Sequence, residues 1–526
     1  MYPSERLPVS PPSCFSRSQP RGMLHVSIQV RLAPLSPSFL RIAVCLAAVL
    51  AISVGCVLPP WGPSRSATGQ IAFTHVTVVD VVTGALRHDQ TVLTDGGRIV
   101  SVTASAAFGV PTRTRVVDGT AKYLIPGLWD AHVHLSYVGA CALPVFVANG
   151  VTSVRDAGAR LDEIVPWRAQ IARGELPGPQ IRTAGPNIES GAWLDLAYGL
   201  APTSDPIWHW GQRLRMNGPA NAAIVVDSLA RAGVDFVKFR NLPRESFLAL
   251  AAEARRRGLR LAGHAPKGTT LEAAAAAGLG SVEHAETVTL ALASAPEADR
   301  LRTLAVIARA GMFVTPTLVT EVTLWLTSDS VARAILADSA GARDSRRRYV
   351  SRRTLNLWTH ALVLNKKGAD ESVDWQALYR RHVADMRLAR RAGVRFLAGS
   401  DVGALTGLYP GTGLHEELGL LVRDVGLTPL EALRSATTAP AAFFGMEQAM
   451  GTVAPGMAAD LVLLDADPLA DVGNMRRIRA VMVGGRLFDR ADLDSALAAV
   501  ARDVHNGIGC AREPRPFRGL NSRGDR

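Results

Sequence analysis

The stretch Ile125-Pro-Gly-Leu-Trp-Asp-Ala-His-Val-His-Leu135 decides the fold of this chain. It follows an apolar run with two histidines at alternate positions, His132 and His134. Side chains at i and i+2 of a strand point to the same side, so the two imidazoles are placed to hold one metal ion. On its own, such a pair is more often a surface feature at a strand end. The later residues of the chain decide between these two interpretations.

Seven further strand-like runs follow, separated by helical runs rich in Ala, Arg and Leu. Alternating β and α units predict a parallel sheet, and eight units predict a closed (β/α)8 TIM barrel over residues 126–449. The alternative is an open doubly wound sheet, but no GxGxxG pattern follows a strand to support it. The seven runs are residues 150–155, 180–184, 235–239, 259–263, 281–283, 312–316 and 394–398.

Both flanks of this region alternate apolar and polar residues, as half-buried strands do. Asp95-Gly96 is a hairpin turn signal inside the first flank. We therefore predict a small β-sandwich domain formed from both chain ends, residues 71–125 and 450–490. Two separate hairpin modules are the alternative.

The N-terminal residues 1–58 have the layout of a bacterial export segment. Arg41 precedes the apolar run 42–58, and Ser53-Val-Gly-Cys56 resembles a lipoprotein cleavage box. Lipid anchoring, a cleaved export signal and an uncleaved anchor remain open, and Met1 or Met23 could be the start. We expect an exported protein, periplasmic or extracellular and either free or attached to the membrane. Residues 59–70 read as a linker and 491–526 as a C-terminal tail.

The formal net charge of +12 is concentrated at the two ends of the chain. Residues 1–41 contribute +4 and residues 512–526 contribute +3, which leaves +5 for the body. No basic and aromatic module of the kind that binds RNA or DNA is recognisable, so we expect no nucleic-acid partner. The five Cys show no metal-ligand spacing, and we expect no disulfide framework.

Metal-ligand types recur at the predicted strand ends after His134. In a barrel, the carboxyl ends of all strands meet at one mouth, where the chemistry takes place. A lone lysine, histidine or strand-end aspartate has an ordinary structural explanation, but together they predict a metal site. The later residues are Lys238, His264, His284 and Asp401.

These motifs resemble those of the amidohydrolase superfamily over about residues 71–490. Within it, the chain looks most like imidazolonepropionase-like enzymes and metal-dependent Xaa-Pro or Xaa-Arg/Lys dipeptidases. The motifs that carry the resemblance are the opening stretch, the lone Lys238, Gly263-His-Ala265, Val282-Glu-His-Ala285, Gly399-Ser-Asp-Val-Gly403, Leu427-Thr-Pro-Leu-Glu-Ala-Leu433, Ala436-Thr-Thr-Ala-Pro440 and Pro455-Gly-Met-Ala-Ala-Asp-Leu461.

The resemblance implies a role for each residue. His132, His134 and Asp401 would hold one metal ion, and His264 and His284 a second. Lys238, carboxylated by CO₂, would bridge them, because a carbamate offers two anionic oxygens and an ammonium offers none. Zinc suits this set of His and oxygen ligands.

The implied reaction is hydrolysis of an amide or peptide-like C–N bond. A metal-bound hydroxide would attack the carbonyl, and Asp401 would pass its proton to the leaving amine. A dipeptide or an N-acyl amino acid is the expected substrate. The alternatives are a mononuclear cyclic-amide hydrolase or deaminase and, in another class, a non-catalytic scaffold that keeps the fold.

Two residues are candidates for binding the small-molecule substrate. Tyr137 lies three positions after His134, and Arg240 lies two after Lys238. Arginine matches a carboxylate well, but a surface salt bridge explains Arg240 equally. Residues 191–210 are rich in aromatics and are interpreted as a lid or as packing. Residues 318–391 either cap the site or carry a subunit contact, so a homo-oligomer remains open.

Overall fold

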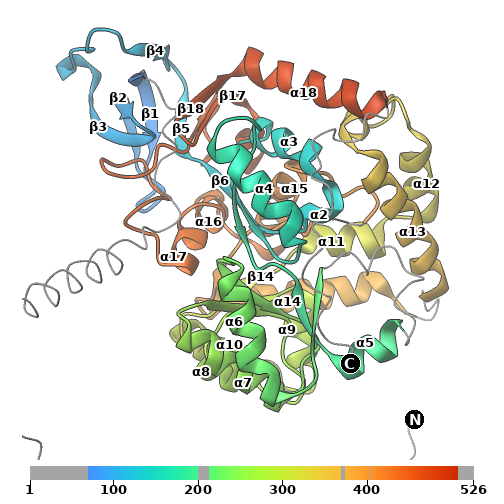
Figure 1. The fold of residues 1–526 in the computed structure, drawn as a ribbon. Coiled ribbons are helices and arrows are strands. Elements are labelled where there is room, and N and C mark those ends of the chain that lie inside the picture. The colour runs from blue at the N-terminus through green and yellow to red at the C-terminus, as the bar shows by residue number, and fades with distance from the viewer. Residues whose placement is uncertain (1–68, 199–211, 369–372, 404, 507–526) are drawn as a thin grey trace, which may run out of the picture. The chain divides into compact units, whose positions relative to one another are not determined.

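The parallel strands of the computed structural model begin with β6 (Leu128–Val133), the strand of the opening stretch. The structure describes residues 69–198, 212–368, 373–403 and 405–506. All eight predicted strands are present at the expected places (Figure 1). The other seven are β7 (Val151–Asp156), β8 (Gln180–Thr183), β11 (Phe236–Phe239), β12 (Arg260–Gly263), β13 (Leu279–Glu283), β14 (Phe313–Thr315) and β15 (Arg395–Phe396).

These strands belong to two parallel sheets that backbone hydrogen bonds connect. β6, β7 and β8 form one sheet, and β11 to β15 lie consecutively in the other. The Ala131 amide donates to Ala398 O at 2.8 Å, and the Asp235 amide donates to Thr183 O at 2.8 Å. The strand order is therefore that of a TIM-barrel-like fold.

Two strands of the second sheet were not predicted. β9 (Asn187–Ser190) and β10 (Arg213–Met216) pair in parallel with each other, and β9 touches β11 through Ile188 and Phe239. Both are only four residues long, β9 has a single apolar residue, and the alternation of Arg and Leu or Met in β10 is too short to identify a strand. They extend the sheet beyond the eight-strand pattern.

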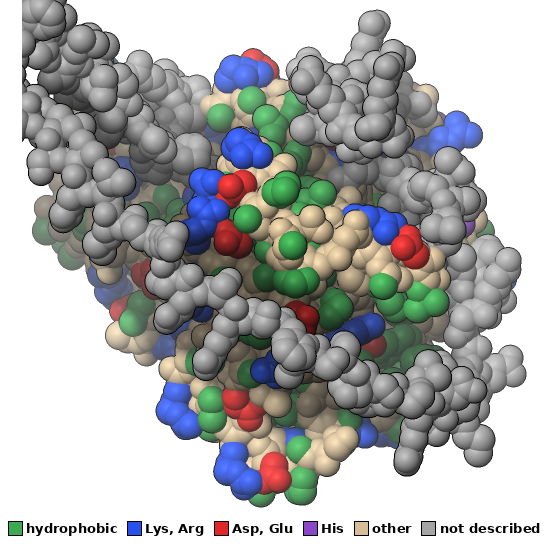
Figure 2. All heavy atoms as spheres, turned by 60° about the horizontal axis from the view of Figure 1, so that its bottom comes forward, with side chains coloured by type: hydrophobic (Ala, Val, Ile, Leu, Met, Phe, Trp, Pro, Cys, Tyr) green, Lys and Arg blue, Asp and Glu red, His purple; other side chains and the backbone are tan. Residues whose placement is uncertain are grey.

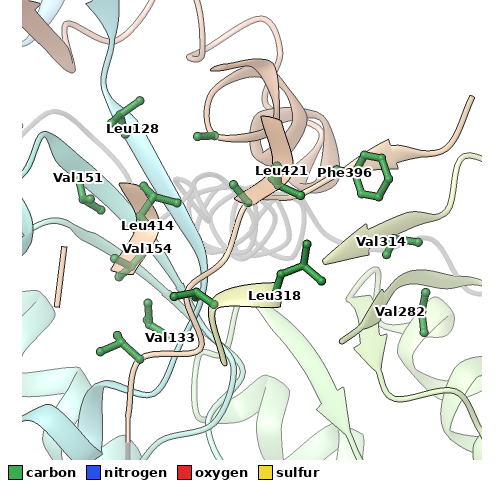
Figure 3. Packing of buried hydrophobic residues seen from close by; sticks show 14 of the residues in the cluster. Leu128, Val133, Val151, Val154, Val282, Val314, Leu318, Phe396, Leu414 and Leu421 are labelled. Carbon is green, nitrogen blue, oxygen red and sulfur yellow. The ribbon is translucent and has the colours of Figure 1, made fainter. Parts of the chain in front are cut away.

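Helices cover the parallel strands with one apolar face each. In α7 (Arg244–Arg256), Phe247, Leu250, Ala251 and Ala254 are buried at the spacing of one helix face. The strands contribute Val154, Val282 and Val314 to the same core (Figure 3). The other outer helices include α6 (Ala222–Arg231), α8 (Leu271–Ala277), α10 (Glu297–Arg309) and α14 (Trp375–Arg391).

The remaining strands form one eight-stranded sheet from both flanks of the chain. Strand β5 (Tyr123–Pro126) is its junction, because it pairs in parallel with β1 (Ile71–Val79) and antiparallel with β16 (Leu461–Leu464). Gly96 and Gly97, with positive φ angles, form the turn between β2 and β3. The rest are β2 (Leu86–Asp95), β3 (Arg98–Ala104), β4 (Arg115–Asp118), β17 (Ile478–Val483) and β18 (Arg486–Asp489).

The expected β-sandwich is thus a single connected sheet. The two predicted layers are joined because β5 has one flank's strand on each of its edges. Its own apolar cluster includes Phe73 and Val92 from the first flank and Leu463 and Met482 from the second. Only Gly127 separates β5 from β6, so the sheet passes directly into the first parallel strand.

The crossover between β14 and β15 lies against the mouth of the parallel strands. It contains α12 (Asp329–Ala337) and α13 (Arg352–Gly368). Trp358 of α13 is fully buried, and its indole donates to Gly403 O at 3.3 Å. Thr354 donates to Tyr137 O at 3.3 Å. These contacts fit the capping role expected for residues 318–391.

Both ends of the chain were given a role in the sequence analysis, and one cysteine in the body differs from expectation. The export segment and most of the linker, residues 1–68, lie outside the described residues. Among the helices that are described, none is long and apolar enough to cross a membrane. The expected C-terminal tail begins with helix α18 (Arg490–His505), which Asp489 and Asp492 cap reciprocally. Cys141 is disulfide-bonded, a bond that the cysteine spacing did not predict.

Candidate active site

His132, His134 and Asp401 form a compact cluster at the end of β6. Their ligand atoms lie within 4.8 Å of one another. Asp401 Oδ1 is 3.1 Å from His134 Nε2 and 3.5 Å from His132 Nε2. The Asp401 amide donates to His132 O at 2.6 Å, and its φ of 52° turns the backbone sharply. Such a strained backbone at a strand end is typical of functional sites.

The other two predicted histidines adjoin this cluster. The ring centroids of His132 and His284 are 4.8 Å apart, and those of His264 and His284 are 4.9 Å apart. His284 Nδ1 is 4.0 Å from Asp401 Oδ2. The structure therefore brings the four predicted histidines and Asp401 together at one place.

Lys238 lies on β11 with its side chain almost completely buried, at 1% exposure. Its ammonium forms no hydrogen bond or ion pair with the residues that the structure describes. Burial lowers its pKa to about 7, with help from the positive charges of Arg155 and Arg240 against the opposing charge of Glu283. Its charge in turn lowers the pKa of His132, His264 and His284, which places it beside them.

The protonation states of these residues fit a metal site. Burial lowers the pKa of His132 to about 4 and the pKa values of His264 and His284 well below the usual range, so the imidazoles are neutral. Burial alone would raise the pKa of Asp401, but the neighbouring histidines outweigh it, and the carboxylate stays ionised. His132 Nε2 is buried and accepts no hydrogen bond from a described residue. Neutral imidazole nitrogens and a carboxylate oxygen are metal donors.

Hydrogen bonds from Nδ1 fix the ring orientations of His132 and His134. His132 Nδ1 donates to Glu283 Oε2 at 2.7 Å, and Arg155 donates to the same oxygen at 2.6 Å. His134 Nδ1 donates to Gly158 O at 3.0 Å. These bonds hold the protons on Nδ1, so both Nε2 lone pairs face Asp401.

Glu283, Arg155 and Asp130 support the site and were not predicted from the sequence. Arg155 is buried between the rings of Phe236 and Phe443, with its guanidinium carbon 5.5 and 4.8 Å from their centroids. Asp130 accepts from the Ser400 amide at 2.8 Å and from its hydroxyl at 2.6 Å, which fixes the loop that carries Asp401. Burial raises the pKa of Asp130 to about 7. A charged residue in a predicted inner strand needs a buried partner, but the sequence does not show which residue that partner is.

Of the two substrate candidates, Tyr137 is the nearer to the cluster. It is buried in α2 (Leu135–Val138), with its ring centroid 5.7 Å from that of His134. Arg240 follows β11, and its partly exposed side chain lies 3.8 Å from Glu189 Oε1. Thus Arg240 makes a salt bridge, but with a fully buried carboxylate at the site, not on the surface.

The predicted lid is described only in its first part. Helix α5 (Gly191–Tyr198) places the Trp193 ring under Lys267, with the ammonium 4.7 Å from the centroid. Residues 199–211, with Trp208, His209 and Trp210, lie outside the described residues. Two histidines away from the cluster have partners of their own, Glu321 for His382 at 2.9 Å and Asn149 O for His415 at 2.9 Å.

Comparison with known proteins identifies a matching family and a curated relative. The model of the amidohydrolase family matches residues 123–488. Ochratoxinase of Aspergillus niger is 33% identical over 117 residues, which are 22% of this chain and 23% of that protein. The matched segment therefore spans about a quarter of the curated relative.

Solved structures resemble the chain over most of its length. A Xaa-Pro dipeptidase with bound methionine has a TM-score of 0.61 at 20% identity, covering 80% of this chain and 100% of that one. Bottromycin amidohydrolase has a TM-score of 0.62 at 23% identity, covering 84% and 95%. A. niger ochratoxinase has a TM-score of 0.57 at 20% identity, covering 80% and 96%. At these identities, the likeness shows a shared fold.

Proposed function

Because this chain belongs to the amidohydrolase family and is a hydrolase acting on C–N bonds, we propose that it cleaves the amide bond of a dipeptide or an N-acyl amino acid with the aid of bound metal. The observation that supports this most is the cluster of His132, which is buried, with His134 and Asp401, which are partly buried. The names of its relatives, a Xaa-Pro dipeptidase, an amidohydrolase and an ochratoxinase, agree with an amide or peptide-like bond.

The proposed metal ligands are the six residues expected from the sequence. His132, His134 and Asp401 would hold one ion, His264 and His284 the second, and Lys238 would bridge them. Bound zinc would polarise the substrate carbonyl and make a water molecule acidic enough to attack at neutral pH. The fit rests on the neutral, buried imidazoles and on the His132 Nε2 atom that accepts no hydrogen bond.

Lys238 is suited to carboxylation because its environment favours the neutral amine. With a pKa near 7, a large share of the side chain is uncharged at neutral pH, and its nitrogen lone pair is available to CO₂. The nitrogen would form a bond to the CO₂ carbon and lose one proton, which leaves a carbamate. Arginine has no comparable amine.

Asp401 is the proposed proton carrier. It remains ionised, so it can accept a proton from the attacking water. It would then deliver that proton to the amine that leaves, as general acid–base catalysis requires. Glu283, through His132, and Ser400, through the loop backbone, keep the participants in position.

The proposal includes the wider architecture. Residues 126–449 would close as a (β/α)8 barrel, and residues 71–125 with 450–490 would act as one β domain. We also propose export from the cytoplasm, with or without a lipid anchor. The disulfide at Cys141 supports export, because such bonds persist in oxidising compartments.

Metal analysis and hydrolysis assays test the proposal. About two zinc ions per purified chain, with hydrolysis of Xaa-Pro, Xaa-Arg or N-acyl amino acids, is the expected result. One ion together with turnover of cyclic amides or amines would favour the mononuclear alternative. Absence of both metal and hydrolysis would favour a scaffold.

A further inference from the structure

A buried charge cluster adjoins the metal ligands on the side of β9, β10 and β11. Glu189 of β9 is fully buried and forms an ion pair with Arg213 of β10. Arg240, just after β11, lies 3.8 Å from the same carboxylate. Two guanidinium groups thus approach one Glu189 side chain.

Glu189 is already engaged by Arg213, which leaves the charge of Arg240 only partly compensated. The 3.8 Å separation is too long for a hydrogen bond. The Arg240 Nε atom is buried and makes no hydrogen bond with the described residues. Burial, with the positive charge of Arg240, lowers the pKa of Arg213 to about 9. An anion would relieve this repulsion.

Arg240 also lies close to the reacting centre. Its amide donates to Ile188 O at 2.8 Å, which continues the pairing of β11 with β9 beyond the strand end. It stands two residues after Lys238, so in extended backbone both side chains emerge on one face, about 7 Å apart along the strand.

We propose that Arg240 binds the free α-carboxylate of the substrate's leaving amino acid, and that Glu189, paired with Arg213, is the positioning residue that aims it. In a dipeptide or an N-acyl amino acid, this carboxylate is two bonds from the scissile nitrogen. A carboxylate bound by Arg240, two residues after Lys238, therefore places that nitrogen beside the metal ligands. The inference rests on the proposed hydrolytic function and assigns to Arg240 the recognition of the free α-carboxylate that dipeptides and N-acyl amino acids share.

Matched substrate pairs test this with the full, metal-loaded chain. Each dipeptide or N-acyl amino acid is compared with its C-terminal amide. The wild type is expected to favour the free acid by about 10–100-fold in kcat/KM, which corresponds to the free energy of a charge-assisted hydrogen bond. R240K should lower kcat/KM for the free acid at least tenfold more than kcat/KM for the amide, because a point charge cannot replace the guanidinium fork. E189Q should raise KM for the acid more than it lowers kcat.

R215K is the matched control. Arg215 lies on β10 together with Arg213, but it pairs with Asp195 at the surface. It should change neither substrate's kinetics. Equal loss of acid and amide turnover in R240K, with normal metal content, would overturn the inference.

Binding is measured separately from turnover by calorimetry of free L-amino acids against their amides. If no amino acid binds the wild type more tightly than its amide, the inference fails whether or not the protein hydrolyses anything. If amino acids bind as expected but no substrate is cleaved, the proposed hydrolysis fails instead.

Discussion

His132 Nδ1 lies 2.7 Å from Glu283 Oε2, and both side chains are completely buried. Glu283 is held in turn by Arg155, so a buried Arg–Glu–His chain leads to the metal cluster. We expect E283Q to weaken metal binding by about 10–100-fold, because the amide no longer fixes the imidazole proton on Nδ1 with a full charge. Competition with a chelator measures this affinity.

The control for this variant is E286Q, three residues along on helix α9 (Ala285–Ala291), outside the His132 contact. Excess metal should restore most of the activity of E283Q, since Glu283 does not touch the reacting atoms. Unchanged metal affinity in a folded E283Q protein would show that the pair only stabilises the fold. Some loss of thermal stability is expected as well, because Arg155 keeps a buried charge without its partner.

Most of the parallel fold follows from the sequence because its strands are short apolar runs between amphipathic helices. Such runs identify strands β6 to β8 and β11 to β15 without any tertiary information. β9 and β10 were not predicted. β9 pairs with β11, and Glu189 of β9 forms an ion pair with Arg213 of β10, contacts that the sequence does not show. Local pattern carries no signal for strands that tertiary contacts define.

The site also combines residues that the local sequence reveals with residues that only tertiary contacts reveal. The ligand types at strand ends could be found in the sequence because all carboxyl ends of a barrel meet. Their supporting partners could not, because Glu283 meets His132 and Asp130 meets Ser400 across long sequence separations. The surface shows a similar limit: acidic and basic side chains lie side by side on the face in Figure 2, a pairing that net charge does not reveal.

K238A is expected to lose the bridge between the proposed metal ions. Alanine offers no oxygen, so metal content should fall by about half and activity to near background. K238R tests the carbamate specifically, since it keeps a cation but cannot be carboxylated. K122A is the control, because Lys122 pairs with Asp465 in the eight-stranded sheet. Full activity and metal content in K238A would exclude the bridged pair.

G403A should impair activity with little loss of stability. A Cβ atom at this position would lie 2.9 Å from Tyr137 Cδ2 and 3.3 Å from His134 Cβ, so the tyrosine ring has to move. A displacement of this kind can reduce kcat by about 100-fold. The control is G419A on α15 (Thr412–Leu420), where a Cβ meets nothing within 4 Å. Equal kinetics for the two variants would show that Tyr137 has no part in the reaction.

Glu417 should make folding stability depend on pH. It is fully buried on α15 and accepts from the Val319 amide at 2.9 Å, while burial raises its pKa to about 8. The folded state therefore prefers the protonated acid, whose usual pKa is near 4.5. Its stabilising contribution is complete below about pH 4.5 and is lost as the pH rises to about 8, at up to about 1.4 kcal/mol per pH unit.

E417Q mimics the protonated acid and should remove this pH dependence. Denaturant titrations at pH 5, 6, 7 and 8 are expected to show the variant gaining on the wild type as the pH rises. E447Q, at an exposed glutamate, controls for the substitution itself and should run parallel to the wild type. Because the other buried carboxyl groups are common to all three proteins, their contributions cancel in the difference. If E417Q also runs parallel to the wild type across this range, Glu417 is not the group that titrates.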